Sequence, residues 1–329
     1  MNNQMIEKEI REENKIQGNQ QVKESRNKSQ EDLRVLQLTL PKKALYLDRN
    51  CELTERDIEM FVFLDRYGVA TLGQLWSIFF KGVSQETVPW LFLEQKADGK
   101  GVFNAAYQRL IKLTAAGYLD RRVASGQIMF KPAAKAQWQL SKRGLTKFAK
   151  PPSWPQEVET EHALTLTACG AIFKSMLGLT VIAQREIHSD YAKLSEIDRE
   201  DDGGRSYLPD FYLQYDGRRL RFEFERTLKS DRRYKEYWDW LGACMCAQQP
   251  YLLYLTATDG IKHHLLRLAD EGYHPGLYVC CLDDFKDALG KATFKNTFGK
   301  VTDLKEHEIM DLRSEATSIQ SGLLLTGIK

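Results

Sequence analysis

The sequence of 329 residues has no apolar run of the ~18 residues that a membrane-spanning helix needs. Its first 30 residues are polar and lack the apolar core of a signal peptide. The six cysteines show neither the C-x-x-C pairs of a zinc site nor the even spacing of a disulfide framework. These absences favour a cytoplasmic protein with reduced thiols and no contact with a membrane.

Net charge is also nearly absent, because 47 basic residues stand against 45 acidic ones. The balance differs along the chain: residues 51–150 hold 15 basic and 9 acidic residues, and residues 151–329 hold 22 and 28. Within 102–150 there are 10 basic residues and a single acid, Asp120. Such an excess is typical of a surface that binds phosphates. A basic, solvated face without a partner is the alternative.

The pattern of apolar and helix-capping residues divides the chain into four parts. Residues 1–50 are polar and are expected to form a flexible arm. Residues 51–150 predict helices over 54–68, 71–79 and 104–116, a hairpin over 118–130 and a fourth helix opened by Ser141. The Pro-rich stretch 151–155 places a boundary before a second domain, 156–300, and a tail, 301–329.

Residues 51–150 have the element order of a winged helix-turn-helix. Its recognition helix would lie over 104–116, and the wing would be the hairpin. The side chains expected to bind DNA come from this helix, from the base of the hairpin and from the fourth helix: Tyr107, Gln108, Arg109, Lys112, Arg121, Arg122, Lys142 and Arg143. A small helical dimerisation domain would show the same apolar pattern and is the alternative.

The second domain contains a strand pattern that turns at Asp216-Gly217, the dipeptide favoured by two-residue hairpins. If these residues form the loop, Phe211 faces Phe222 and Asp210 faces Glu223. Asp210, Glu223 and Glu225 then share one face, where like charges need neutralisation. Mg²⁺ or Mn²⁺ prefers such oxygen ligands and would activate a phosphodiester for hydrolysis. An acidic strand edge that prevents aggregation is the alternative.

Glu161 and His162 are further candidates for the same site. Glu161 is a candidate metal ligand and His162 a candidate catalytic residue, because both lie just before an apolar helix over 163–177. The second domain alternates between helix and strand, with a helix over 230–243 and strands over 251–255 and 277–282. We therefore expect an α/β (α+β) fold with a mixed sheet flanked by helices.

Pro209-Asp210 followed by Glu223-Phe224-Glu225 resembles the PD-(D/E)-x-K nuclease pattern, and residues 53–258 resemble the replication-relaxation family with its MobC-type plasmid relaxases. The resemblance implies a restriction-endonuclease-like domain after a winged helix, nicking of DNA at an origin of transfer, and accessory mobilisation or coupling proteins as partners. In the resemblance, His162 matches a histidine at a helix start, and Lys235 and Tyr237 match a later helix rich in lysine and tyrosine. The sequence departs from the pattern at Glu225, where a lysine is expected. Lys229 or Arg226 would have to supply the cation, or Glu225 is a further metal ligand.

The resulting hypothesis is a plasmid mobilisation relaxase that binds double-stranded and single-stranded DNA and cuts one strand with Mg²⁺ or Mn²⁺. Its catalytic residues would be Asp210, Glu223, Glu225, His162 and Lys229, and its metal ligands Asp210, Glu223, Glu225 and Glu161. Two alternatives stay open. One is a non-catalytic regulator of plasmid replication or transcription, and the other is a restriction-type endonuclease that cuts both strands.

Overall fold

The computed structural model describes residues 51–92, 103–124, 126–193, 208–215, 218–244, 252–272, 277–287, 293–296 and 301–303. The predicted arm, 1–50, and nearly all of the predicted tail lie outside these residues. The chain divides into two units, Met1–Cys51 and Glu52–Lys329, and nearly all of the described residues belong to the second. Its described part is a mixed α/β fold with two sheets. Among the described helices, none combines the length and apolarity needed to cross a membrane.

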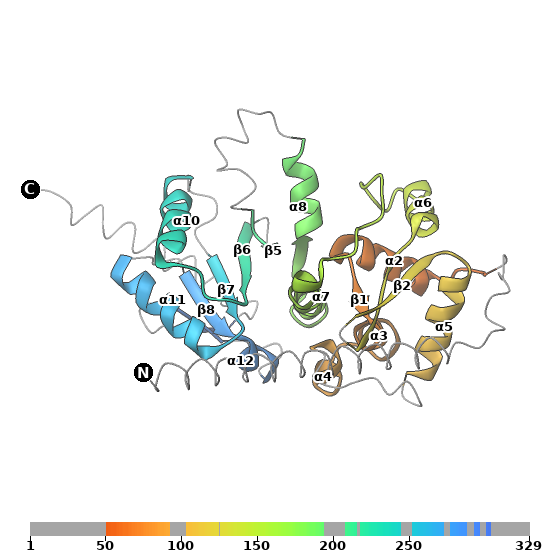
Figure 1. Cartoon of the computed structure of the whole chain (residues 1–329), viewed down its shortest axis with the longest axis horizontal. Helices are drawn as coiled ribbons and strands as arrows, with labels where there is room; N and C mark the ends of the chain where they lie inside the picture. The colour runs from red at the N-terminus through yellow and green to blue at the C-terminus, as the bar shows by residue number, and fades with distance from the viewer. Residues whose placement is uncertain are drawn as a thin grey trace, which may run out of the picture. The chain divides into compact units, whose positions relative to one another are not determined.

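The first half of this unit places a small sheet among helices (Figure 1). Strand β3 pairs with β2 on one side and with the short β1 on the other. The elements are α2 (Glu55–Tyr67), β1 (Ala70–Thr71), α3 (Leu72–Trp76), the π-helical turn η2 (Ser77–Lys81), the 3-10 turn η3 (Gln85–Thr87), α4 (Val88–Leu91), α5 (Asn104–Ala115), β2 (Leu119–Ala124), β3 (Gln127–Pro132) and α6 (Ala134–Lys142).

Capping explains where some of these helices begin. Thr54 and Thr71 each form a capping box, with Asp57 and Gln74 respectively, so both predicted starts are confirmed. Two other expectations were wrong. Helix α5 follows Phe103, and no side chain caps it. Ser141 lies in the last turn of α6, which begins seven residues earlier at Ala134 because its apolar side buries Ala136 and Leu140.

The second half is built on a seven-stranded sheet with the order β10-β9-β8-β7-β6-β5-β4. Strands β4, β5 and β6 are antiparallel, β6, β7 and β8 are parallel, and β9 and β10 return antiparallel. The elements are α7 (Glu157–Met176), β4 (Thr180–Ala183), α8 (Gln184–Tyr191), β5 (Phe211–Tyr215), β6 (Arg218–Glu225), α10 (Asp231–Cys244), β7 (Leu252–Thr256), α11 (Asp259–Gly272), β8 (Leu277–Cys281), α12 (Leu282–Asp287), β9 (Thr293–Asn296) and β10 (Val301–Asp303).

The predicted hairpin register is confirmed between β5 and β6. Phe211 pairs with Phe222, Leu213 with Leu220, and Tyr215 with Arg218. Residues 216 and 217 themselves lie outside the described residues. The two-residue spacing leaves only one register that buries the apolar side chains of both strands, and this is the one adopted.

Helices cover both faces of this sheet (Figure 1). The α7 face carries Phe222, Phe224 and Leu255, which pack with residues of α7 and α12. The opposite α10 face carries Leu252 and Tyr254, which pack with residues of α10 and α11. Because successive strand residues point to opposite faces, Arg221, Glu223 and Glu225 belong to the α10 face. The side chains of β6 that the sequence singled out, Glu223 and Glu225, therefore lie on the side covered by α10.

Helix α7 also joins the two halves. Thr167 Oγ1 donates to the Val69 carbonyl at 2.8 Å, and Gln74 Nε2 donates to the Leu164 carbonyl at 2.7 Å. Gly170 lies where a side chain would overlap the ring of Tyr67 on α2. Only a residue without Cβ lets the two helices approach this closely.

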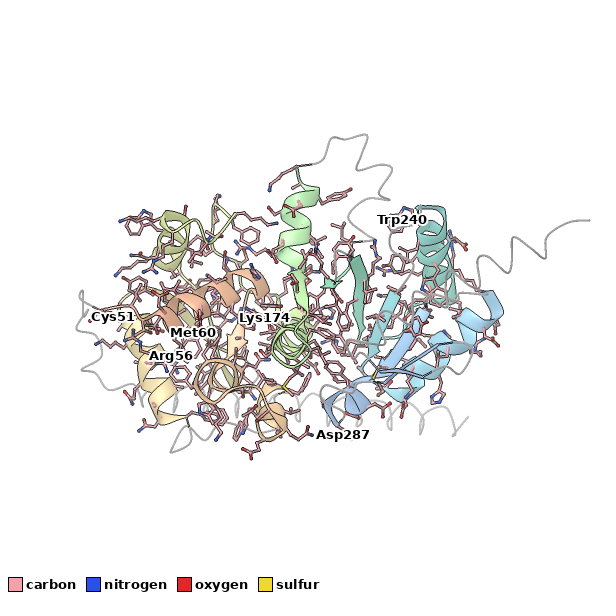
Figure 2. The ribbon with its side chains drawn as sticks, turned by 180° about the vertical axis from the view of Figure 1, so that it is seen from behind. Cys51, Arg56, Met60, Lys174, Trp240 and Asp287 are labelled. Atoms are coloured by element: carbon pink, nitrogen blue, oxygen red, sulfur yellow. The ribbon has the colours of Figure 1, made fainter. Side chains whose placement is uncertain are left out.

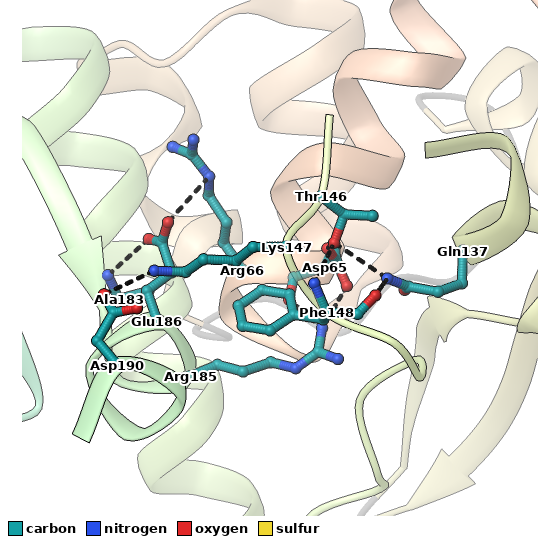
Figure 3. Close-up of polar contacts among 10 residues, drawn as sticks. All are labelled: Asp65, Arg66, Gln137, Thr146, Lys147, Phe148, Ala183, Arg185, Glu186 and Asp190. Atoms are coloured by element: carbon teal, nitrogen blue, oxygen red, sulfur yellow. Dashed lines mark hydrogen bonds and ion pairs between the residues drawn. The ribbon is translucent and has the colours of Figure 1, made fainter. Parts of the chain in front are cut away.

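A polar network ties α2 to the segment after α6 and to α8 (Figure 3). The buried carboxylate of Asp65 receives hydrogen bonds from Arg185 and Thr146. The Arg185 guanidinium also lies 3.9 Å from the ring centroid of Phe148. Lys147 and Asp190 form an ion pair at 2.7 Å beside it. Because the Asp65 charge is buried, losing the Arg185 guanidinium would leave it without a cation, at a high cost in stability.

We predict that Gly170→Ala lowers the free energy of unfolding by about 3 kcal/mol, since the new methyl group overpacks against Tyr67. Urea denaturation followed by circular dichroism measures the change. Gly260→Ala on α11 is the control, because its Cβ would have 3.8 Å to its nearest neighbour, Thr258 Oγ1. A Gly170→Ala protein as stable as the Gly260→Ala protein contradicts the prediction.

Candidate functional site

The candidate site lies where β5 begins and β6 ends. Because β5 and β6 are antiparallel, Asp210, just before β5, comes next to the last residues of β6. Pro209 has no N–H, so it cannot donate a backbone hydrogen bond that would extend the pairing of the two strands. The Asp210 side chain completes the pairing instead: Phe224 N donates to Asp210 Oδ2 at 2.8 Å. The carboxylate is thereby fixed at the end of the strand.

Asp210 also contacts α7. His162 Nε2 lies 3.2 Å from Asp210 Oδ1, and the imidazole packs against the Phe224 ring with centroids 5.4 Å apart. Helix α7 begins at Glu157, earlier than predicted, so His162 sits within its second turn. The structure therefore brings His162 and Asp210 together, as the sequence suggested.

Glu223 is held from the α10 side. Tyr237 OH donates to Glu223 Oε1 at 2.8 Å. Burial raises the pKa of Glu223 to about 8, and the negative charge of Asp210 adds to this shift, against smaller opposing effects of Tyr237, Arg221 and Lys229. Burial and the Glu223 charge likewise raise the pKa of Tyr237 above its usual value. At Glu223, the nearby cations therefore do not offset the effects of burial and of the Asp210 charge.

Arg221 is the nearest buried cation on the same strand face. Its Nη1 donates to Tyr212 OH at 3.4 Å, and its guanidinium lies 5.9 Å from the Tyr237 ring and 5.4 Å from the Trp240 ring. Trp240 is labelled on α10 in Figure 2. The sequence analysis gave neither Arg221 nor Trp240 a role. The alternation along β6 does place Arg221 on the face of Glu223 and was the available signal.

The remaining predicted acids have cations of their own. Glu225 is buried, and Lys229 Nζ lies 2.7 Å from its Oε2. Glu161 is exposed and pairs with Arg226 at 3.3 Å. Lys229 is held from α10 as well, since its backbone N donates to Tyr234 OH at 3.1 Å. The five predicted catalytic residues thus contact one another in two separate pairs, His162–Asp210 and Glu225–Lys229, with Glu223 bound to Tyr237.

The four predicted metal ligands do not come together as one set. Within the part of the chain that the structure describes, no group of three or more His, Cys, Asp or Glu side chains is arranged to hold a metal ion. Asp210 and Glu223 are the two predicted ligands without an ion pair to Lys or Arg in the described contacts, and the negative charge of Asp210 contributes to the raised pKa of Glu223. Mg²⁺ commonly binds through one or two carboxylates and keeps water in its other positions. Lys229 and Arg226 neutralise Glu225 and Glu161, and these two acids do not need a metal.

The predicted DNA-binding residues fall into exposed and engaged groups. Gln108, Lys112, Arg122, Lys142 and Arg143 are exposed, and Tyr107 and Arg121 are half-buried. Arg143 pairs with Glu55 at 3.5 Å. Arg109 is engaged most strongly: its Nε donates to the buried Asp57 at 3.0 Å, and its Nη2 donates to the Glu52 carbonyl at 2.7 Å. The Arg109 side chain therefore fastens α5 to the start of α2.

Comparison with protein-family models, with curated proteins and with solved structures gives no match. The contacts above are thus the basis for any functional conclusion.

We predict that Glu223→Gln makes the protein more stable at high pH, by about 1 kcal/mol or more. Between the unfolded pKa near 4.5 and the folded pKa of about 8, the folded wild type binds a proton that the unfolded chain releases. Its stability therefore falls as pH rises through this window, whereas the neutral glutamine removes this contribution.

Chemical denaturation in chelating buffer at pH 5 and pH 8.5 measures this difference. Glu59→Gln, an exposed position on α2, is the control and should follow the wild type. Parallel pH profiles of the Glu223→Gln and wild-type proteins would disprove the raised pKa.

Proposed function

We propose that this protein is a metal-dependent DNA-nicking enzyme, and more specifically a plasmid mobilisation relaxase. The observation that carries the proposal is that Asp210 is fixed beside the last residues of β6, where Phe224 N donates to it, and that its negative charge adds to burial in raising the pKa of Glu223 despite the opposing effects of Arg221 and Lys229. Acids held in this state are expected where a cation and a phosphate are to bind.

The order of elements supports the same proposal. Helix α7, the antiparallel strands β4 to β6, helix α10 and the parallel strand β7 occur in the order of restriction-endonuclease-like domains, with helix α8 added between β4 and β5. In the first half, α2, β1, α3, α5 and the β2–β3 hairpin follow the order of a winged helix-turn-helix. A DNA-binding module joined to an acidic site accounts for the charge asymmetry of the sequence.

In the proposed reaction, Asp210 and Glu223 hold Mg²⁺ or Mn²⁺, which supplies Lewis-acid activation of the phosphodiester when bound. His162 orients the Asp210 carboxylate through their 3.2 Å contact. Tyr237 fixes Glu223 in the same way from the α10 side. The nuclease pattern expects a lysine two residues after Glu223, where this chain has Glu225. Lys229, held by the buried Glu225, offers the missing cation. Its ammonium is suited to orient the attacking water or to stabilise negative charge on the phosphate.

A second candidate is a DNA-binding regulator without catalysis. It is favoured by the ion pairs of Glu225 with Lys229 and of Glu161 with Arg226, which leave only two acids for a metal. The predictions below distinguish the two candidates.

We predict that Asp210→Asn lowers the rate of nicking of a supercoiled plasmid carrying the cognate origin by about 100-fold or more, a typical cost of losing one strong electrostatic contribution. Asparagine can still accept the hydrogen bond from Phe224, so the fold is expected to remain. Asp239→Asn, an exposed position on α10, is the control. Full nicking by the Asp210→Asn protein would remove this carboxylate from the mechanism.

The same proteins report metal binding without activity. Mn²⁺ at about 100 times its dissociation constant should stabilise the wild type by about 2.7 kcal/mol. The thermal shift should be lost in Asp210→Asn and kept in Asp239→Asn. A wild type that binds DNA but shows neither nicking nor a Mn²⁺-dependent shift is the regulator.

We also predict that residues of α5 divide by role. Gln108→Ala and Lys112→Ala should weaken binding to duplex DNA by about 10-fold, because base-edge and phosphate contacts are each worth about 1–3 kcal/mol.

Arg109→Ala should instead destabilise the fold by about 3 kcal/mol, because it leaves the Asp57 carboxylate buried and unpaired. Fluorescence anisotropy and thermal unfolding measure the two effects, and Lys174→Ala on α7, labelled in Figure 2, is the control for lost charge. Normal stability of the Arg109→Ala protein would contradict this division.

A further inference from the structure

Helix α6 exposes an aromatic ring that the proposed reaction does not use. Trp138 is 58% exposed, and Leu145, shortly after the helix, is 45% exposed. These are two of five large apolar residues that are exposed in the described part of the chain. Burying a tryptophan would contribute about 2–3 kcal/mol or more, so a ring left in water on an ordered helix is a candidate for contact with a partner.

The surroundings of Trp138 are positively charged. Lys142 Nζ lies 5.2 Å from the centroid of the Trp138 ring. Residues 121–156 contain no Asp or Glu. The acidic partners of cations in this segment lie on other elements. Arg143 pairs with Glu55, and Lys147 pairs with Asp190. Lys135 lies over the ring of Tyr118 at 4.2 Å and donates to the Ala116 carbonyl.

The helix that carries this ring is firmly held. Its other side buries Ala136 and Leu140 in the core. Gln137 Nε2 donates to Thr146 Oγ1 at 3.0 Å and to the Phe148 carbonyl at 2.8 Å, and Thr146 in turn bonds Asp65 (Figure 3). A ring on such a support can receive a planar group without paying much ordering entropy.

We propose that the Trp138 face of α6, made of Trp138 with Lys142, binds single-stranded DNA. An unpaired base stacks on the indole, and an adjacent phosphate meets the Lys142 ammonium. A second copy of the chain fits less well, because a two-fold contact would set the same cations against each other. The inference rests on the proposed nicking function, because nicking and strand separation would expose the unpaired DNA that this face binds.

Binding of the full chain to a labelled oligo(dT) of about 16 nucleotides and to a duplex of equal length, in chelating buffer, tests the proposal. Trp138→Ala should weaken single-strand binding about 10-fold, in line with the stacking of one base, and change duplex binding less than about 2-fold. Trp138→Phe should restore most of the affinity. Lys142→Ala should reduce the salt dependence of single-strand binding by about 0.7 in its logarithmic slope.

Met176→Ala removes another exposed apolar side chain and Lys174→Ala another exposed lysine, both on α7, and both should bind like the wild type. Unchanged single-strand binding by Trp138→Ala overturns the proposal, as does an equal loss on duplex. A concentration-dependent oligomer that disappears in Trp138→Ala would assign this face to a second copy and would also overturn it. These titrations need neither metal nor cleavage. Their result therefore tests single-strand binding whatever the nicking assay with Asp210→Asn shows.

Discussion

The close fit of helix α7 between the two halves is the constraint on which the rest of the structure depends. On one side, Gly170 allows Tyr67 of α2 to approach the helix backbone. On the other, Phe173 meets Phe222 of the seven-stranded sheet with ring centroids 5.1 Å apart. The same helix carries His162 to Asp210. The position of His162 at Asp210 is therefore set by apolar packing on both sides of one helix, and a shift of α2 would reach this contact through rigid, closely packed side chains.

The parts of the fold that the sequence predicted are those governed by local rules. The Asp216-Gly217 dipeptide and the alternation around it predict the register that β5 and β6 adopt, and the Thr54 and Thr71 capping boxes mark their helices within four residues. The start of α6 at Ala134 depends instead on burial against the rest of the protein, and no nearby cap announces it. Helix α8 and strands β9 and β10 were missed for a different reason, because short elements have little periodic signal.

The candidate site shows the same division. Alternation placed Glu223 and Glu225 on one strand face, but the sequence could not assign cations to them. Lys229 reaches Glu225 only because the chain turns after β6 and Tyr234 holds that turn. Counting charges had a similar limit in the first half. Arg109 contributes to the basic excess, yet the buried Asp57 uses its guanidinium, so the surface offers fewer cations than the composition indicates.

Three ionisable side chains of β6, Arg221, Glu223 and Glu225, differ in how the fold compensates their charge. Arg221 among aromatic rings and Glu225 with Lys229 are each compensated within the fold. Glu223 is not, because burial and Asp210 together raise its pKa to about 8, so that ionising it near neutral pH costs stability. A glutamine would keep the hydrogen bond from Tyr237 without that cost. The proposed function accounts for a carboxylate at this position, because a bound divalent cation would supply the positive charge that Glu223 lacks within the fold.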